Sequence, residues 1–504
     1  MKKLIYISLL FVSYSCSIFK PTYKVIGNSP AEQYAGTITA EELKIHLEII
    51  ASDEYEGRET GKNGQRMTAD YLKKELDSYG LTPGNKRNSF QYFKLNETQK
   101  PEATFSFHNK DFVYAKDFYF FQNYAKFESF QVLAEELVPV EYGIVEGKRN
   151  DYDSKEVKGK IVVIKVESPK EFSSWDWKKK VKLAEKMGAK QVIFASDKFE
   201  STLNRLHHFL TKSSMTLATD EAKKKAEFIP FFFFSDELLS EIYRLEKTEK
   251  DYVERYPLYE TLEFMYQKLD GKIESSNVLG LIEGSDPVLK NEYIILTAHY
   301  DHLGIQDGEI YNGADDDGTG TVALLEIAQA FQKAKEEGNG PKRSILIMPV
   351  SGEEKGLLGS RYYSENPVFP LENTVANLNI DMIGRLDEYH TEDNYVYVIG
   401  ADKISQELHN VNEATNKKYT QLELDYRFNK ENDPNRFYYR SDHYNFAKNG
   451  IPVIFYFSGV HEDYHQPTDE VHKIMFPKVE KITQLVFYTA WELANKPSRL
   501  EINK

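Results

Sequence analysis

The sequence predicts an α/β fold in which a mostly parallel sheet is covered by helices on both faces, with a second, smaller α/β unit inserted. From Asn277 onward, apolar β-rich segments alternate with amphipathic ones, as in NVLGLIEG, EYIILTAHYD and TGTVALLEIAQAFQKAKEE. This alternation is typical of parallel sheets whose strands are buried on both faces. Between about residues 117 and 266 a different run of strand-like and helical segments indicates the inserted unit.

The remaining elements follow from local patterns. Thr39 precedes AEEL and has the character of a helix N-cap. Residues 64–79 place apolar side chains at helical spacing, which predicts a second helix. In the insertion, KGKIVVIKV and KQVIFAS are typical of strands, WKKKVKLAEKMGA of a helix, and the four phenylalanines 231–234 of a buried strand. A last helix is predicted from about residue 477 to 494.

The N-terminus has the features of a secretion signal. Two lysines precede the apolar run LIYISLLFV, which is too short to span a bilayer. Small residues stand before Cys16, in a pattern similar to the site at which bacterial lipoproteins are cleaved and lipidated. We expect residues 1–15 to be a signal peptide, Cys16 to carry the lipid and residues 16–38 to be a spacer. The protein would lie in the bacterial cell envelope, in the periplasm or on the outer membrane, or be secreted without an anchor.

Charge and cysteine content exclude several classes of function. The chain has 64 Lys and Arg against 79 Asp and Glu, a formal net charge of −15, which disfavours nucleic acid as a partner. Cys16 is the single cysteine, so disulfide scaffolds, thiolate zinc sites and a cysteine nucleophile are excluded from the body of the protein. A metal would have to be bound by His, Asp and Glu.

Histidine, aspartate and glutamate residues follow four of the predicted strands. They are His299 and Asp301 after YIILTA, Glu353 and Glu354 after LIMPVSG, Asp381 after ANLNI, and His465 after IPVIFYFSG. Sites in open α/β sheets form at the carboxyl ends of strands, where an acidic loop, GADDDG, also precedes a helix. Crowded carboxylates need cations to stay ionised, and zinc at one or two sites fits these ligands, with manganese or cobalt as substitutes.

Spacing also suggests separate roles within the cluster. Strand periodicity places Asp301 on the same face as His299, where it can orient the imidazole rather than bind metal. Adjacent Glu353 and Glu354 must point differently, so one can bind metal while the other accepts a proton from the attacking water.

Six ordered motifs resemble one protein family: TAHYDHLG, NGADDDGTGTVALLE, VSGEEKGLLGS, NIDMIGR, SDHYNFAKNGIPVIFYFSG and YHQPTDE. They are similar to the co-catalytic di-zinc aminopeptidases of the aminopeptidase S and aminopeptidase Y type, a family that includes glutamate carboxypeptidase and the transferrin receptor. The early segment ASDEYEGRETG shares in this resemblance. The resemblance implies a zinc-exopeptidase domain formed by residues 39–116 and 267–498, with a protease-associated domain at 117–266.

The resemblance also implies a set of site residues for two zinc ions per chain. It assigns Asp315 as the bridging ligand, His299 and Asp381 to one zinc, and Glu354 and His465 to the other. Glu353 would be the general base and Asp301 the partner of His299. Ser441 and Asp442 would support the site, and the Asp315–Asp316 peptide would be the place for a cis bond.

The expected function is therefore removal of N-terminal residues from peptides by a water that bridges the two metals. The membrane would be contacted only through the lipid. Three alternatives stay open: a carboxypeptidase with Arg385 or Arg440 as carboxylate-binding groups, a single-zinc acyltransferase similar to glutaminyl cyclase, and a non-catalytic surface binding protein. The segment His461-Glu-Asp-Tyr-His465 also matches the single-zinc H-E-x-x-H pattern, but the nearby Pro467 favours a loop over the helix that this pattern needs.

Overall fold

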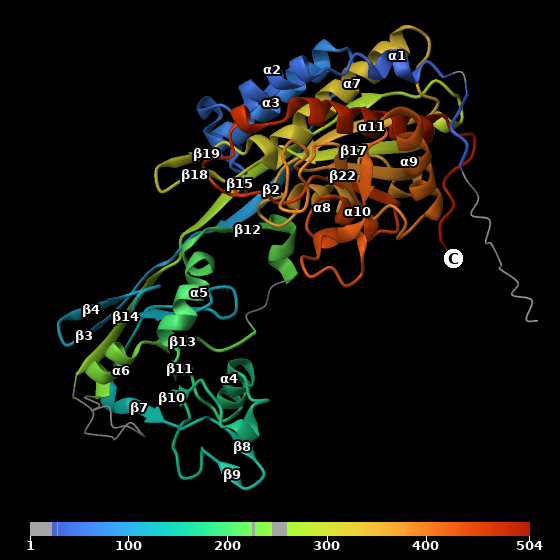
Figure 1. Ribbon diagram of the computed structural model, residues 1–504. Coiled ribbons are helices and arrows are strands. Elements are labelled where there is room, and N and C mark those ends of the chain that lie inside the picture. Colours follow the sequence, from blue (N-terminus) through green and yellow to red (C-terminus); the bar gives the residue numbers. More distant parts are fainter. Residues whose placement is uncertain (1–22, 28, 224–226, 244–259, 504) are drawn as a thin grey trace, which may run out of the picture. The chain divides into compact units, whose positions relative to one another are not determined.

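The computed structural model describes residues 23–503 except 28, 224–226 and 244–259 (Figure 1). The predicted signal peptide and Cys16 lie outside the described residues. The chain divides into two compact units, one formed by residues 1–92 and 275–504 and the other by residues 93–274. Among the helices that the structure describes, none combines the length and apolar character needed to cross a membrane.

The first unit is built on a mixed eight-stranded sheet whose order is β1-β16-β20-β17-β21-β24-β22-β23. The four central strands β20, β17, β21 and β24 are parallel, and β16 and β22 run antiparallel to their inner neighbours. The bounds are Thr82–Pro83 (β1), Gly280–Ile282 (β16), Ser344–Val350 (β20), Tyr293–His299 (β17), Thr374–Ile380 (β21), Val453–Phe457 (β24), Tyr395–Ile399 (β22) and Glu423–Asp425 (β23).

Helices cover both faces of this sheet because successive strand residues are apolar. In β17, Ile294 and Leu296 join the large core beneath the helices on one face, whereas Ile295 joins a core with Tyr363 and Phe446 on the other. The first face carries α1 (Ala31–Ala35), α2 (Ala40–Ile50), α3 (Asn63–Ser78), α7 (Gly320–Glu336), α9 (Gln406–Tyr419) and α11 (Phe476–Asn495). The second carries α8 (Leu358–Glu365) and α10 (His443–Ala447). The predicted α/β fold is confirmed.

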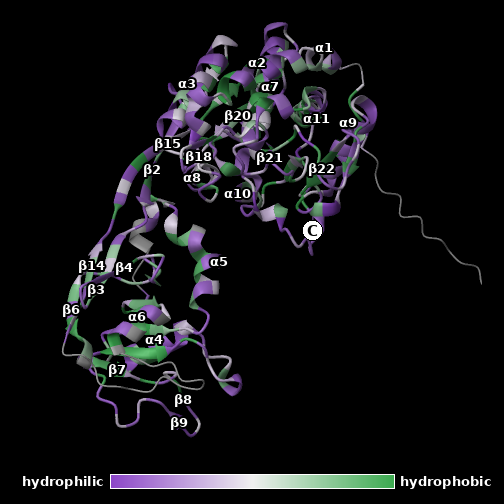
Figure 2. Ribbon diagram, turned by 60° about the vertical axis from the view of Figure 1, so that its left-hand side comes forward, coloured by the Kyte–Doolittle hydropathy of each residue, from purple (hydrophilic) through white to green (hydrophobic). Residues whose placement is uncertain are grey.

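Local expectations for the first unit are also confirmed. The Thr39 hydroxyl accepts a hydrogen bond from the Glu42 amide at the start of α2, which is the N-cap geometry. Helix α3 occupies the segment with helical spacing, and its apolar side chains face the core. In Figure 2 the ribbon of α3 has mostly hydrophilic colours, as expected for a helix that buries only one face.

The second unit contains its own smaller sheet, of order β5-β13-β11-β10-β7, in which β13, β11, β10 and β7 are parallel and β5 is antiparallel. Phe231–Phe234 forms β13 and is fully buried, as predicted. The other bounds are Phe118–Tyr119 (β5), Gln191–Ala195 (β11), Ile161–Lys165 (β10) and Leu137–Pro139 (β7), with helices Trp177–Lys186 (α4), Phe199–Thr211 (α5) and Asp236–Tyr243 (α6). An antiparallel sheet, β4-β3-β14-β6, adds Lys110–Val113, Glu102–Phe107, Thr261–Gln267 and Phe130–Leu133.

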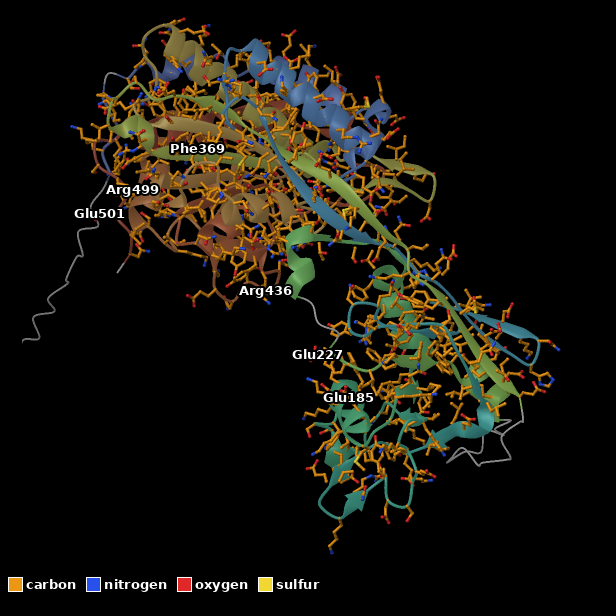
Figure 3. All side chains as sticks on the ribbon, turned by 180° about the vertical axis from the view of Figure 1, so that it is seen from behind. Glu185, Glu227, Phe369, Arg436, Arg499 and Glu501 are labelled. Carbon is orange, nitrogen blue, oxygen red and sulfur yellow. The ribbon has the colours of Figure 1, made fainter. Side chains whose placement is uncertain are left out.

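The boundaries of this unit differ from those predicted, 117 and 266. Strand β3 lies upstream of residue 117, yet it pairs with β14 and places Phe105 against Phe232 and Phe264. The chain enters along β2 (Phe90–Thr98) and returns along β15 (Asp270–Val278), which are neighbours in a three-stranded sheet with β12 (Ser214–Leu217). These strand pairings extend the unit beyond the predicted boundaries at both ends. Sequence patterns did not reveal the extension because they do not show which distant strands pair. Charged side chains such as Glu185 and Arg499 cover the surfaces of the two units (Figure 3).

Candidate metal centre

The candidate residues gather at the carboxyl ends of the four central strands of the first unit. His299 is the last residue of β17 and is paired with Val350, the last residue of β20. Asp381 directly follows β21. Because the central strands are parallel and in register, the loops that leave them converge at one edge of the sheet.

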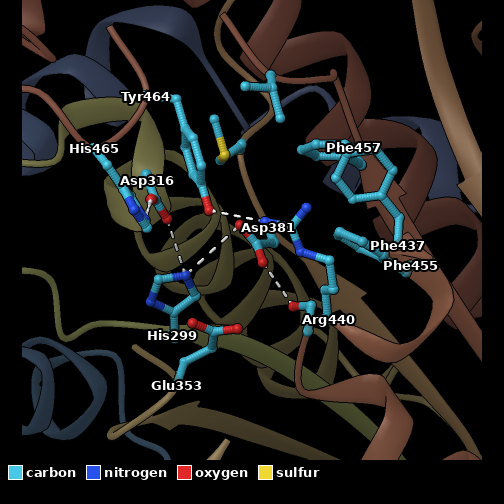
Figure 4. Close-up of a pocket in the computed structure, with 13 residues that line it drawn as sticks. His299, Asp316, Glu353, Asp381, Phe437, Arg440, Phe455, Phe457, Tyr464 and His465 are labelled. Atoms are coloured by element: carbon cyan, nitrogen blue, oxygen red, sulfur yellow. Dashed lines mark hydrogen bonds and ion pairs between the residues drawn. The ribbon is translucent and has the colours of Figure 1, made fainter. Parts of the chain in front are cut away.

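A first donor group consists of His299, Asp316 and Asp381 (Figure 4). The Nε2 atom of His299 lies 3.2 Å from Asp316 Oδ1 and 3.6 Å from Asp381 Oδ1. The hydroxyl of Ser441 donates to Asp381 Oδ2 at 2.6 Å, which fixes the orientation of that carboxylate. The expected supporting role of Ser441 therefore has a direct geometric counterpart.

A second donor group consists of His302, Asp316 and Glu354. His302 Nδ1 lies 3.0 Å from Glu354 Oε1 and 3.7 Å from Asp316 Oδ2. His465 joins this group, with its Nε2 atom 3.2 Å from Asp316 Oδ2 and 3.3 Å from Glu354 Oε1. Asp316 thus presents Oδ1 to the first group and Oδ2 to the second, which is the arrangement of a bridging carboxylate.

This geometry corrects the predicted bridging residue, Asp315, by one position. Asp315 points away from both groups: its Oδ1 accepts from the Gly384 amide at 2.7 Å, and its Oδ2 lies 3.2 Å from His461 Nε2. The cis peptide joins Asp316 and Asp317 rather than Asp315 and Asp316. Three consecutive aspartates look alike in sequence, and only the backbone path of the loop decides which one faces the strand ends.

Asp469 and Asp317 hold the loop that presents Asp316. Asp469 accepts hydrogen bonds from the backbone amides of Asp315 and Asp316 at 3.0 and 3.1 Å. Asp317 accepts from the amides of Gly320, Met382 and His299, so it ties the start of α7 to the ends of β21 and β17. These carboxylates therefore serve main-chain amides, which leaves Asp316 free for the two donor groups.

Asp301 is in the expected place but contacts His299 differently from the prediction. The Nδ1 atom of His299 lies 2.9 Å from the main-chain oxygen of Asp301 and 3.9 Å from its carboxylate. The carboxylate instead accepts from the Thr60 hydroxyl at 2.6 Å and from the Glu353 amide at 3.3 Å. The chain turns directly after β17, so strand periodicity no longer applies at Asp301, which orients the imidazole mainly through its carbonyl.

The donor set fits divalent metal ions of the zinc type. Within the part of the chain that the structure describes, Asp316 Oδ2, Glu354 Oε1 and both ring nitrogens of His302 are buried without a hydrogen-bond partner. Buried polar atoms without partners are costly, and a bound cation satisfies imidazole and carboxylate donors together. The same ligand types exclude a thiolate-based site and match zinc, manganese or cobalt.

Electrostatics separate the two adjacent glutamates. Burial and the Asp316 carboxylate oppose ionisation of Glu354, but the imidazoles of His302 and His465 outweigh them and lower its pKa to about 2. Burial raises the pKa of Glu353 well above its usual range, and the Glu354 carboxylate adds to this effect. Glu354 is therefore the better metal ligand, whereas Glu353 is the better proton carrier.

A pocket opens beside the first donor group. Its polar lining residues include His299, Asp316, Glu353, Asp381 and His465, and its apolar ones are Met382, Phe437, Phe455, Phe457 and Val460. In Figure 4 the three phenylalanines lie on the other side of the pocket from His299 and Glu353. The Arg440 guanidinium donates to the Tyr464 hydroxyl at 3.3 Å. A substrate could therefore place a polar, reacting group near the carboxylates and an apolar side chain against the phenylalanines.

Comparison with protein families now adds to this geometry. Residues 277–490 match the model of peptidase family M28, and residues 133–242 match that of the PA domain. Residues 277–490 therefore form a peptidase family M28 domain. The first segment contains every donor residue described above, and the second contains the four parallel strands β7, β10, β11 and β13 of the smaller sheet.

Curated relatives match this chain only in part. A probable glutamate carboxypeptidase of Arabidopsis thaliana is 36% identical over 121 residues, which is 24% of this chain and 16% of the relative. An aminopeptidase of Mus musculus is 37% identical over 110 residues, or 21% of this chain and 14% of the relative. The matches span less than a quarter of the length of these relatives.

Solved structures share the fold over nearly the whole chain. An aminopeptidase from Aneurinibacillus sp. strain AM-1 has a TM-score of 0.56 at 18% identity, and covers 94% of this chain and 98% of its own. A zinc aminopeptidase from Bacillus subtilis has a TM-score of 0.50 at 19% identity, and covers 91% and 96%. At 18% and 19% identity, this likeness shows a shared fold and nothing about activity.

The H-E-x-x-H pattern of the M28 domain does not form a single-zinc site. His461 and His465 lie in a turn rather than on a helix, and they contact different aspartates, Asp315 and Asp316. The two arginines considered for carboxylate binding also differ. Arg440 lines the pocket, whereas Arg385 donates to the Asp463 carboxylate at 2.9 Å.

Sequence reasoning gave no role to Arg58, although it lies in the quoted motif ASDEYEGRETG. Its guanidinium is fully buried and donates to the main-chain oxygens of Tyr300, Asn312 and Gly313, and also to that of Ile50. These carbonyls belong to the loops that carry His302 and the three aspartates. Arg58 thus braces the metal centre of the M28 domain from behind, and a buried arginine of this kind leaves no signal in sequence periodicity.

Proposed function

We propose that this protein is a zinc-dependent exopeptidase that uses two metal ions per chain to remove N-terminal residues from peptides. One observation carries the proposal: Asp316 presents one oxygen to each of two donor groups at the edge of a pocket that also contains Glu353. Membership of residues 277–490 in peptidase family M28 supports hydrolysis of peptide bonds as the reaction.

The residues of the chain divide the chemical work between them. When bound, the metals supply Lewis acidity at the scissile carbonyl and lower the pKa of the attacking water. Glu353 lines the pocket and accepts the proton of that water, then transfers it to the leaving amine. The apolar wall formed by Phe437, Phe455 and Phe457 holds the substrate side chain and excludes bulk water.

The charge of the pocket favours an amino-terminal substrate. Glu353 is the lining carboxylate that binds no metal, and it can attract a protonated α-amine. Arg440 is the single lysine or arginine among the described lining residues, and it already donates to Tyr464. The presence of Arg440 nevertheless favours one second candidate, a carboxypeptidase in which this guanidinium binds the substrate carboxylate.

Metal analysis combined with a substrate panel tests the proposal. The purified protein should contain close to two zinc ions. It should hydrolyse aminoacyl amides with a free amine but not their N-acetylated forms, and a chelator should abolish this hydrolysis. Cleavage of N-blocked peptides at a free carboxyl end would support the carboxypeptidase instead. Absence of chelator-sensitive hydrolysis of either substrate class would refute both.

We also propose that the protein is exported and anchored through a lipid on Cys16. The support is the basic, apolar and small-residue pattern of residues 1–16. Radiolabelled palmitate supplied to expressing cells should appear in the wild-type protein and not in a Cys16→Ser variant. Equal labelling of both forms, or of neither, would contradict the anchor.

A further inference from the structure

The metal centre contains one imidazole more than the five ligands implied by the family resemblance. His302 is fully buried, and neither of its ring nitrogens has a hydrogen-bond partner among the described residues. Its Nδ1 atom faces the same two carboxylates, Glu354 and Asp316, as His465 does. A buried imidazole without a partner needs an explanation.

His302 and His465 both lie at short distances from the same two carboxylates. The contacts of His302 Nδ1 and His465 Nε2 with Glu354 Oε1 are 3.0 and 3.3 Å, and their contacts with Asp316 Oδ2 are 3.7 and 3.2 Å. Zinc bonds to nitrogen and oxygen of about 2.0–2.2 Å in a tetrahedron place donor atoms roughly 3.3–3.6 Å apart. Each imidazole nitrogen therefore lies near this spacing from the same two carboxylates, as a metal ligand would.

The local backbone is shaped around the His302 ring. A Cβ atom on Gly313 would lie 2.4 Å from His302 Cδ2, so a larger residue at position 313 would displace the imidazole. Gly313 also has a φ of +54°, in the left-handed region that favours glycine. On the other side, the His302 amide donates to the Arg58 carbonyl at 3.2 Å.

We propose that His302 is a direct ligand of the second metal, in addition to Asp316, Glu354 and His465. The inference rests on the proposed function, since it concerns the same metal centre. The first site has three donors, His299, Asp316 and Asp381, and keeps a position open beside the pocket.

Two substitutions of His302 distinguish a metal ligand from a residue that only hydrogen-bonds to Glu354, and a third variant serves as a control. In His302→Cys the thiolate can still bind metal, whereas in His302→Asn the side-chain amide can still donate to the carboxylate but is a poor metal ligand. His46→Asn is a matched control, because His46 lies on α2 and contacts Tyr71 and Tyr79 rather than the metal centre.

Metal affinity is measured on the purified full chain by competition with a chromophoric chelator, and cobalt-substituted protein is examined by absorption spectroscopy. In His302→Asn the affinity of one of two sites should fall more than 100-fold, beyond the roughly 10–100-fold lost when a partner of a ligand is removed. His302→Cys should restore most of that affinity and add a thiolate-to-cobalt charge-transfer band. His46→Asn should leave both sites unchanged.

The opposite pattern would overturn the inference: His302→Asn keeps tight binding at both sites, or His302→Cys shows no charge-transfer band while cobalt is bound. Circular dichroism and the thermal midpoint of the metal-free variants establish that they are folded. Failure of the proposed function is separately visible, because the wild-type chain would then bind fewer than two metals or cleave no peptide whatever the role of His302.

Discussion

The two sheets of this protein that contain parallel strands differ in how the polar groups at the carboxyl ends of those strands are satisfied. In the PA domain, the buried Lys180 amine donates to the carbonyls of Lys165, Val166 and Glu167 where β10 ends, at 2.7, 3.0 and 3.2 Å. In the M28 domain, the strand ends carry imidazoles and carboxylates whose polar atoms stay partly unsatisfied. The ends of parallel strands therefore carry polar groups that satisfy one another in one domain and a metal centre in the other.

The difference teaches that sheet topology fixes only where a site can form. Parallel strands bring several loops to one edge in both domains. What decides function is whether the polar groups at that edge satisfy one another. At the end of β11 the Ser196 hydroxyl donates to the Glu167 carboxylate at 2.7 Å, so this pair needs no ligand.

Substitution of the shared carboxylate is the strongest test of the metal edge. Asp316→Ala should remove both metals and lower kcat/KM at least about 1,000-fold, because both donor groups lose a ligand. Asp315→Ala is the matched control and should retain measurable metal and activity, since the Asp315 carboxylate contacts Gly384 and His461 rather than a member of either donor group. Metal content by atomic emission and steady-state kinetics measure both effects. If the Asp315 variant lost the metals and the Asp316 variant kept them, the bridging residue would be Asp315 after all.

The proton-transfer role of Glu353 predicts a loss of rate without a loss of metal. Glu353→Gln should lower kcat by roughly 100- to 1,000-fold because the amide cannot accept the proton. Its metal content should stay that of the wild type, which distinguishes it from Glu354→Gln, where one metal should bind more weakly. Near-normal hydrolysis by the Glu353 variant would sink the assignment.

The two buried cations offer a direct comparison between the domains. Arg58→Lys and Lys180→Met each leave main-chain carbonyls without a donor and should lower the free energy of unfolding by about 2–3 kcal/mol. Only the Arg58 variant should also bind metal more weakly, because its carbonyl partners belong to the metal-binding loops. Chemical denaturation and chelator competition measure the two quantities. A Lys180 variant with equally weakened metal binding would show that the domains are coupled.

A buried acid on the covered face of the M28 sheet has the smallest expected effect. Burial and nearby Glu42 raise the pKa of Glu326 on α7 to about 8. Also facing it are His46, 3.6 Å away, and the phenols of Tyr71 and Tyr79. The folded state thus retains a proton that the unfolded chain loses above its ordinary pKa of 4.5, and stability should fall as the pH rises from about 4.5 to 8.

Glu326→Gln should remove this slope and make the protein about 1–2 kcal/mol more stable than the wild type at pH 8, with little difference at pH 4. The partial gain reflects the need of the buried amide for hydrogen-bond partners of its own. Thermal unfolding of both proteins across this pH range measures the effect, and turnover should be unchanged because Glu326 is remote from the pocket. Parallel pH profiles of the two proteins would disprove the raised pKa.

Much of the fold followed from sequence because its signals are local. Apolar alternation predicted the covered sheet, Thr39 predicted the start of α2, and consecutive phenylalanines predicted β13. The domain boundaries were less accessible, since β3 belongs to the second unit only through its pairing with β14. Strand pairing over long stretches of chain depends on tertiary contacts that no local pattern encodes.

For the metal centre, sequence by itself determined which chemical groups are available: imidazoles and carboxylates after buried strands, and no cysteine in the body of the protein. Tertiary structure alone decided which of these groups meet. It selected Asp316 over Asp315, brought in His302, and placed Arg58 behind the loops. The physical reason is that residue type fixes the chemistry of a side chain, whereas its direction depends on the backbone path set by contacts between distant segments.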